Sequence, residues 1–467
     1  MRAVRSRTAR TTADVTSPVG PLHQLVDAFG LDTVLLATVD VQGRLKGKAY
    51  EARTLVERLR SGRISPEMCG YVIGTDLGMA APQTGAFSWQ TGFGDVALLP
   101  DLQRARVLPW LPGTAVVFAD PTSEGWPHPL GPVTALNEQR NQLAGLGLTA
   151  ALGVETEFVV YEGTTRDAAA AGWRGLRPAT WDNRDYALDQ PGAVAEFGRR
   201  LRQVLAEAGL PVEAVKLEGA PGQTEVTFPY GAPLAMCEQH VLFKHAAKAV
   251  ADERGMAASF MAALPGGVGS GMHLHVSLHS DRGPVLGTGA GAGAGKELSE
   301  LGEQAVAGLL TVLPVTAPLW APYVNSYKRL REHSFAPDRF TWGRDNRSCA
   351  VRVVGHDNSL RLEVRLPGAD ANPVLAVAAV LAGIRHGIAA GLKPPPVSTG
   401  DAYQDHHPRP VPRSLAEALA AFESSTLAAE LLGERVVTHL ASVAHLDLEH
   451  HAARVTDAEL ERGFAQA

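Results

Sequence analysis

The chain has 467 residues, 45% of them hydrophobic and 20% charged, and its formal net charge is −6 at pH 7. This composition is typical of a globular protein, and the length allows a large buried core. The net negative charge argues against nucleic acid or an anionic membrane as the main partner, because binding to either requires a basic protein surface.

No pattern in the sequence indicates export or membrane insertion. The first twelve residues are basic, but the apolar segment of a signal peptide does not follow them. The longest apolar stretch, 374–384, is too short to cross a bilayer and predicts a core helix. Cys69, Cys237 and Cys349 lie far apart without a CxxC pair, which is typical of a reducing compartment. We therefore expect a cytoplasmic protein.

Residues 1–20 are expected to form a disordered tail, followed by a small N-terminal domain over residues 21–115. Within that domain the spacing of apolar residues predicts a helical start, a strand at 33–43 and a helix at 52–62. Short strands punctuated by glycine follow. The apolar, proline-bounded strand region at 108–121 is the expected junction with the next domain.

The remainder of the chain, 116–467, is expected to form one large domain. A helix is predicted at 134–147, and strands and helices alternate after it. The run GTGAGAGAGK at 287–296 is a low-complexity loop. The proline-rich segment 393–413 is irregular and ends at Ser414, the first residue of a capping box that starts a helical tail.

Several charged residues lie inside strongly apolar, strand-like segments. Glu155 and Glu157 are two residues apart in LTAALGVETEFVVYE, so both side chains project from one face of a strand. Two adjacent carboxylates repel each other and lose hydration, and a bound divalent cation relieves both effects. A solvent-exposed polar face is the alternative interpretation.

Two further segments add candidate ligands. Glu218 and Glu225 flank a Pro-Gly loop that can bring two acids together. His273 and His275 share a strand face behind a glycine-rich loop. That spacing suits one histidine as a metal ligand and the other as a hydrogen-bond partner, although structural histidines are equally compatible with it.

The last charged cluster is basic. Arg361, Glu363 and Arg365 form a cation–anion–cation stripe on one strand face, which is also common on solvated strands. More basic residues gather upstream of it, and arginine forks suit phosphate and carboxylate oxygens. These upstream residues are Lys328, Arg329, Arg344, Arg347 and Arg352.

Together these residues have the chemistry of divalent metals bridging nucleotide phosphates, with arginine stabilising charge during phosphoryl transfer. The sequence contains no GxxxxGK[ST] loop and no set of protein-kinase motifs. A nucleotide would therefore be held mainly by metals and arginines.

Six segments stand out in chain order: VETEF, EGAPGQTE, GSGMHLHVSL, NSYKRL, NRSCAVR and LEVRLPGADANP. The amino-acid sequences of these segments and their order resemble glutamine synthetase from about residue 30 to the end of the chain. Within that family the chain resembles the branch of γ-glutamylpolyamine and γ-glutamylethanolamide synthetases. The resemblance implies an α+β fold, with a small N-terminal β-grasp domain and a large catalytic domain built on a curved antiparallel sheet flanked by helices.

The resemblance also assigns site residues. It implies ATP and two Mg²⁺ or Mn²⁺ ions, one bound by Glu157, Glu218 and Glu225, the other by Glu155, His273 and Glu363. Positions that contact the nucleotide are Glu213, His275, Ser277, Arg352 and Arg361. Positions that hold glutamate are Gly269, Arg329 and Arg365, and Arg347 assists phosphoryl transfer. Family members act as homo-oligomers, usually dodecamers, with active sites between subunits.

Departures from the family pattern concern the side of the site that receives the amine. The Asp and paired Ser that help ammonia-using members bind ammonium cannot be aligned with CGYVIGTDLGMAAPQTG. By its spacing from Arg329, Phe335 replaces a flap glutamate that takes a proton from the amine. Val268 replaces an asparagine expected before the Gly-Ser-Gly loop.

These changes remove negative charge, which a small cation in a low-dielectric pocket needs. An organic amine would instead gain apolar or cation–π contact with Phe335. We therefore hypothesise a ligase that joins glutamate to a polyamine, ethanolamine or another primary amine through γ-glutamyl phosphate. If another acid fills the role, the chain is a glutamine synthetase that uses ammonium. A non-catalytic family member is a third alternative, against which the six intact metal-ligand positions argue.

Overall fold

The computed structural model describes residues 20–63, 66–83, 85–288 and 297–466. The expected disordered tail lies outside the described residues, except for Gly20, which is the first residue of a helix. Most of the predicted glycine-rich loop, 289–296, also lies outside them.

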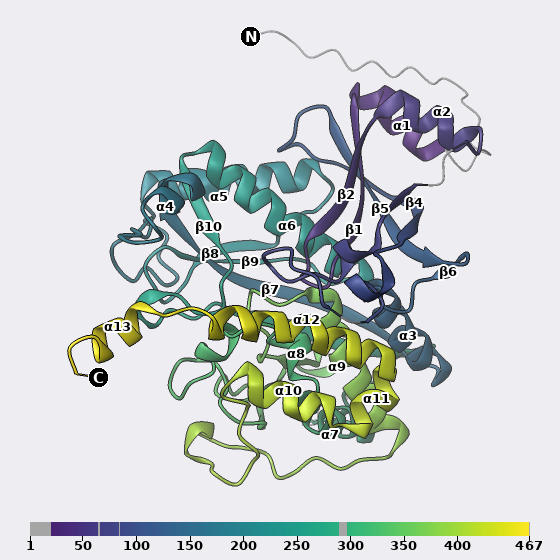
Figure 1. Cartoon of the computed structure of the whole chain (residues 1–467). Helices are drawn as coiled ribbons and strands as arrows, with labels where there is room; N and C mark the ends of the chain where they lie inside the picture. The colour runs from purple at the N-terminus through teal and green to yellow at the C-terminus, as the bar shows by residue number, and fades with distance from the viewer. Residues whose placement is uncertain (1–19, 64–65, 84, 289–296, 467) are drawn as a thin grey trace.

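A small sheet forms the N-terminal part of the fold (Figure 1). Its strand order is β2-β1-β5-β4-β3, and β6 pairs with β5. Strand β1 runs antiparallel to β2 and parallel to β5, the central strand. The helices α1 (Gly20–Phe29) and α2 (Ala52–Arg60) pack against this sheet through a separate apolar cluster. The strands are β1 (Thr33–Val39), β2 (Leu45–Glu51), β3 (Glu67–Cys69), β4 (Asp95–Val107), β5 (Thr114–Ser123) and β6 (Trp126–Pro127).

The predicted strand and helix near the start of the chain are confirmed as β1 and α2. Sequence patterns did not identify β2, because it is an edge strand with mostly exposed, polar residues. The structure assigns the whole of β5 to the small sheet. The division of the chain at residue 115 stays a prediction.

The large sheet has the order β13-β14-β15-β11-β7-β9-β8, with β10 beside β7 and β12 beside β11. Its pairings are antiparallel except that β13 and β14 are parallel. The expectation of a purely antiparallel sheet is therefore wrong at this edge, and the sheet is mixed. The strands are β7 (Thr149–Glu162), β8 (Ala214–Leu217), β9 (Gln223–Thr227), β10 (Met256–Ser259), β11 (Met272–Ser280), β12 (Gly283–Pro284), β13 (Trp342–Arg344), β14 (Val351–Val354) and β15 (Arg361–Val364).

Helices surround the large sheet, as Figure 1 shows. They are α3 (Pro132–Gly145), α4 (Thr165–Ala170), α5 (Gly192–Glu207), α6 (Pro233–Glu253), α7 (Glu300–Val312), α8 (Ala317–Trp320), α9 (Pro373–Ala389), α10 (Leu415–Glu423), α11 (Thr426–Leu432), α12 (Glu434–Ala452) and α13 (Asp457–Gly463). Short 3₁₀ turns are η1 (Gly70–Ile73), η2 (Trp89–Thr91), η3 (Pro265–Gly267), η4 (Leu313–Val315), η5 (Ser326–Lys328), η6 (Asp357–Ser359) and η7 (Ala402–Gln404).

The apolar stretch at 374–384 lies inside α9, as predicted, and is buried along that length. An apolar helix surface on all sides is typical of a helix enclosed by other helices. Within the part of the chain that the structure describes, no helix combines the length and apolar character needed to cross a membrane. The predicted capping box is also confirmed, since the Ser414 side chain accepts from the backbone N–H of Glu417 at the start of α10.

Alternation along β7 determines where the charged residues point. Thr156 and Phe158 face α6: the Thr156 hydroxyl hydrogen-bonds with His240, and the Phe158 ring contacts Phe243. Because neighbouring residues of a strand point to opposite faces, Glu155 and Glu157 project from the other face. One face of the sheet therefore belongs to the core, and the other carries the carboxylates.

Candidate active site

The charged residues form a row across five adjacent strands. Glu157 of β7 lies opposite Glu225 of β9. Glu155 lies opposite His273 of β11 on the other side of β7. The row continues to β15 and β14, where Glu363 lies opposite both His275 and Arg352. These pairings are non-local, and they bring together five of the six motifs that the sequence separates.

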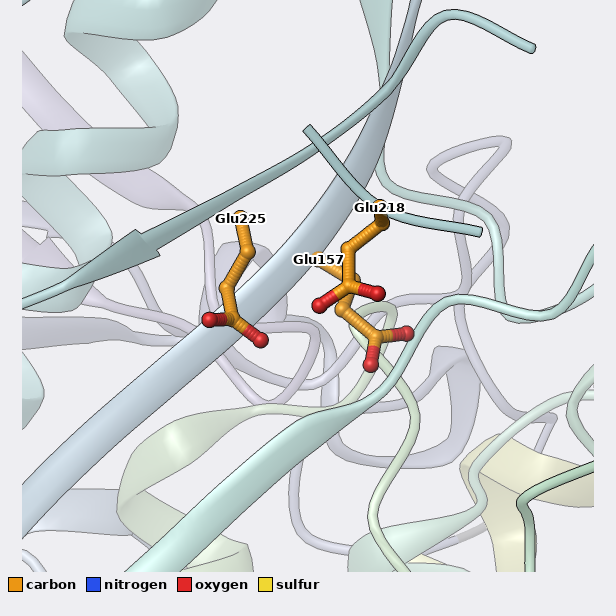
Figure 2. A group of neighbouring side chains, drawn as sticks. All are labelled: Glu157, Glu218 and Glu225. Carbon is orange, nitrogen blue, oxygen red and sulfur yellow. The ribbon is translucent and has the colours of Figure 1, made fainter. Parts of the chain in front are cut away.

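Two carboxylates of the row, Glu157 and Glu225, form a cluster with Glu218, shown in Figure 2. Oxygen atoms of Glu157, Glu218 and Glu225 all lie within 4.8 Å of one another. Glu218 reaches the cluster because the loop after β8 folds back and pairs that strand with β9. Three carboxylates are a suitable donor set for Mg²⁺ or Mn²⁺, which prefer oxygen ligands.

Lys216 belongs to this cluster, although sequence reasoning did not select it. Its ammonium group contacts the carboxylate of Glu218 and lies 3.5 Å from Glu225. It also lies 4.4 Å from the centre of the Tyr186 ring. The signal was available, since Lys216 is two residues before Glu218 and shares its strand face.

The pKa values of Glu225 and of the neighbouring Glu155 are shifted in opposite directions. Burial raises the pKa of Glu225, and the negative charge of Glu155 raises it further. Burial also acts to raise the pKa of Glu155, but hydrogen bonds with His273 and His275 outweigh it and hold that pKa below its ordinary value. The cluster of Glu157, Glu218 and Glu225 thus holds three carboxyl groups and contacts one cation, Lys216. A bound divalent cation would neutralise the remaining negative charge.

The second predicted ligand group also comes together. Nδ1 of His273 lies 3.4 Å from Glu155 and 3.7 Å from Glu363. The Nε2 atom of His273 is buried and has no hydrogen-bond partner among the described residues. Glu363 is more heavily engaged, because it accepts from Arg352 at 2.8 Å and contacts Arg365. Burial acts against ionisation of Glu363, but Arg365, the two histidines and Arg352 bring its pKa to about 2.

A glycine-rich loop adjoins the first cluster. The carboxylate of Glu157 accepts from the backbone N–H of Gly271 at 2.7 Å and from the amide of Gln223 at 3.2 Å. The same Gln223 amide donates to the carbonyl of Gly269. A Cβ atom on Gly271 would lie 2.5 Å from the guanidinium of Arg329, so a larger residue there would displace Arg329. The structure thus places Gly269 and Arg329, both predicted glutamate positions, beside Glu157.

Arg365 connects the remaining substrate positions. Its guanidinium donates to the carbonyl of Arg347 at 3.1 Å and to the carbonyl of Phe335 at 3.3 Å. Arg347 is exposed, and the Phe335 side chain is 72% exposed. Phe335 also has a φ of 57°, a conformation that side chains rarely adopt.

The predicted nucleotide positions are only partly together. Arg361 donates to His275 at 3.3 Å, and Arg352 joins them through Glu363. Ser277 lies further along β11, where its hydroxyl pairs with His279. Glu213 is exposed at the start of β8, which is the opposite edge of the sheet. The structure forms no direct contact between Glu213 and the arginine group among the described residues.

Comparison with known proteins identifies the class to which this fold and site belong. The family model described as glutamine synthetase, catalytic domain, matches residues 130–463. The chain belongs to the glutamine synthetase family. It is an ATP-dependent carbon–nitrogen ligase.

Similar proteins include ligases that use organic amines. The chain is 42% identical to gamma-glutamylethanolamide synthetase GlnA4 of Streptomyces coelicolor, over 98% of each chain. It is 30% identical to glutamate–isopropylamine ligase of a Pseudomonas species, over 94% of this chain and 96% of that one. Among solved structures, a GmaS/ADP complex has a TM-score of 0.81 and 25% identity, over 95% of this chain and 99% of that one.

Proposed function

We propose that this protein joins the γ-carboxylate of glutamate to a small organic primary amine, with ATP as the phosphoryl donor. The observation that carries the ligase chemistry is the cluster of Glu157, Glu218 and Glu225 beside the glycine loop and Arg329. The similarity to an ethanolamide-forming and an isopropylamine-using enzyme supports an organic acceptor. Ethanolamine is our first choice, because its enzyme is the more similar of the two.

The donor sets fit two divalent cations. Glu157, Glu218 and Glu225 would hold one ion, and Glu155, His273 and Glu363 would hold the other. When bound, such ions neutralise nucleotide phosphates and stabilise charge that develops during phosphoryl transfer. The three converging carboxylates support the first site. The Nδ1 atom of His273, which lies within 3.7 Å of both Glu155 and Glu363, supports the second.

The remaining residues of the site bind and orient the substrates. Gly269, Arg329 and Arg365 would hold glutamate, with Gly269 presenting its backbone next to Arg329. Arg347 has an exposed side chain, free to approach the transferring phosphoryl group. Arginine suits that position, since its planar fork matches phosphate oxygens. The nucleotide would lie along His275, Ser277, Arg352 and Arg361, with Glu213 at its far end.

The reaction has two steps, and each step forms one bond to the glutamyl group and breaks a bond to a phosphate oxygen. The glutamate γ-carboxylate attacks the terminal phosphorus of ATP, which gives γ-glutamyl phosphate and releases ADP. The neutral amine then attacks the carbonyl carbon and expels phosphate, and the amine nitrogen loses a proton. The group that accepts this proton is unassigned, because the aromatic ring of Phe335 is not a base.

Phe335 supports the choice of acceptor. Its carbonyl oxygen accepts from Arg365, so its backbone lies beside a proposed glutamate-binding residue, while its ring is exposed. An exposed aromatic face attracts an alkylammonium group through cation–π and apolar contact. Ammonium would gain less from that face, because it lacks apolar surface.

Phosphate release with ATP, Mg²⁺ and glutamate against a panel of amines tests the proposal. We expect turnover with ethanolamine, isopropylamine or a polyamine to exceed turnover with ammonium. Preference for ammonium would make the protein a glutamine synthetase, and nucleotide binding without turnover would make it a non-catalytic member. Because family sites form between subunits, we also propose a homo-oligomer, a dodecamer by resemblance, which sedimentation velocity measures directly.

A further inference from the structure

A large cavity lies apart from the carboxylate row, where β2 of the small sheet faces α6 and β10. Its volume is about 1150 Å³. It is lined by β2 of the small sheet, by α6 and β10, and by the segment that contains α4. None of the described residues that line it is a carboxylate or histidine of the row.

Five lysines line this cavity, and none of them has a carboxylate partner within 4.0 Å in the described part of the chain: Lys46, Lys48, Lys244, Lys248 and Lys328. Lys46 of β2 contacts only the sulfur of Met79, at 2.9 Å. Lys244 of α6 donates to the carbonyl of Ala369 at 2.8 Å. Lys248, one helical turn further, lies 6.0 Å from the centre of the Phe260 ring, and Lys244 lies 5.1 Å from the same ring.

These cations act on one another. Burial lowers the pKa of Lys248, and the charge of Arg44 lowers it further. Burial lowers the pKa of Lys244 to about 8, with a further contribution from Lys248. Arg44 itself is occupied by Asp40, to which it donates at 2.8 Å. Clustered cations in a partly desolvated cavity lose hydration and repel each other, and an anion removes both penalties.

The acidic residues of the wall do not neutralise the lysines directly. Asp370 accepts from the Ser326 hydroxyl at 2.7 Å, and Asp447 accepts from the backbone N–H of Val324 at 2.8 Å. Glu162 is paired with Arg177 at 3.1 Å. The five lysines of the described wall therefore lack a direct ion pair. For Lys244, the charge of a wall carboxylate, Asp370, opposes the lowering of its pKa.

Much of the rest of the wall is apolar or aromatic. Phe260, Met261 and Leu264 lie on one side, and Val241 of α6 lies on another. A pocket of this kind combines a few polar anchors with apolar surface, which is the common form of small-molecule sites. The lysines favour a negatively charged ligand. The volume of the cavity also accommodates the carbon skeleton of a small organic molecule.

We propose that this cavity binds a small organic dianion, a dicarboxylate or a phosphate monoester, between the lysines of β2 and those of α6. The site is separate from the proposed catalytic row, so the inference does not depend on the acceptor amine. Lys46 and Lys248 approach the ligand from different elements, so each contributes to affinity on its own.

Thermal unfolding of the full chain with succinate or phenyl phosphate, and with acetate at equal ionic strength, tests the proposal. A ligand that binds only the folded state raises Tm with concentration. We expect one or both dianions to raise Tm and acetate to have no effect. Preference for succinate or for phenyl phosphate identifies the anionic group.

Variants distinguish this cavity from the carboxylate row. Lys46→Gln and Lys248→Gln should each weaken dianion binding at least ~10-fold. Lys393→Gln, which removes an exposed lysine outside the cavity, should leave it unchanged. Binding should persist in Glu225→Gln. The proposal is overturned if neither dianion binds, or if binding survives both cavity variants. It is also overturned if binding disappears in Glu225→Gln.

Discussion

The ammonium group of Lys216 lies 3.5 Å from the carboxylate of Glu225, inside the cluster of carboxylates proposed to bind a metal ion. It contacts Glu218 as well. A lysine in this position neutralises part of the carboxylate charge when no metal is bound. The same position makes it a competitor of the metal for those oxygens.

Replacement of Lys216 by methionine should therefore tighten binding of Mn²⁺ in the absence of nucleotide. We expect an increase of about tenfold, equivalent to ~1.4 kcal/mol. Electron paramagnetic resonance of free Mn²⁺ during titration measures the change. Lys393→Met is the matched control on the exposed surface. Unchanged or weaker binding in Lys216→Met would show that this lysine supports the metal site instead.

Replacement of Glu225 by glutamine should weaken the same Mn²⁺ binding and the turnover that depends on it. Glu225 is 5% exposed, and its carboxylate is one of three that converge. Loss of one charged ligand should cost at least ~2 kcal/mol, or about 30-fold. Glu67→Gln, at an exposed carboxylate of β3, should leave affinity unchanged. Equal Mn²⁺ affinities in the two variants would show that Glu225 is not a metal ligand.

Replacement of Phe335 by glutamate should shift the acceptor preference toward ammonium. A carboxylate at this exposed position adjacent to Arg365 would supply negative charge and a proton acceptor. We expect the ratio of kcat/KM for ammonium over that for ethanolamine to rise at least ~10-fold. Phe335→Leu keeps an apolar side chain and controls for loss of the ring. An unaltered ratio in Phe335→Glu would contradict the flap assignment.

Stability should fall below neutral pH because of His439. This histidine of α12 is 6% exposed and packs against Phe87 of the N-terminal part, at 6.0 Å between ring centres. Burial, together with a smaller effect of the nearby His128, lowers the pKa of His439 to about 4. The unfolded chain takes up a proton near pH 6.5, whereas the folded chain does so near pH 4.

The contribution of His439 is therefore complete above pH 6.5 and is lost as the pH falls toward 4. Between pH 7.5 and pH 5 it should remove about 2 kcal/mol from the free energy of unfolding. Denaturant titrations at several pH values measure this slope. His439→Gln should flatten it, while His407→Gln, at a fully exposed histidine, should not. Parallel slopes in wild-type and His439→Gln would exclude this residue as the source.

Close packing of α7 and α9 should make their glycines irreplaceable. A Cβ atom on Gly387 would overlap the carbonyl oxygen of Gln304, and one on Gly308 would overlap that of Gly383. We expect Gly387→Ala to lower the free energy of unfolding by about 3 kcal/mol, because two backbones must separate. Gly145→Ala in α3, where a Cβ would meet no atom within 4 Å, should be neutral or slightly stabilising. Similar losses in both variants would contradict this reason.

Local patterns predicted the elements whose signal is contained in a short stretch of chain. The strand β1, the helix α2 and the apolar helix α9 follow from spacing alone. The edge strand β2 was missed, because its exposed residues carry no apolar alternation. The parallel pairing of β13 with β14 was missed for another reason, since strand partners are chosen by contacts between distant segments.

The sequence by itself determined that Glu155 and Glu157 share one strand face, that His273 and His275 share another, and that these motifs resemble one family. Those conclusions need only the two-residue period of a strand and the order of short segments. The resemblance implied that Glu157, Glu218 and Glu225 meet, and only the tertiary structure decided how closely they approach and that Lys216 lies among them. Distances between side chains on different strands depend on register and loop geometry, which no local pattern specifies.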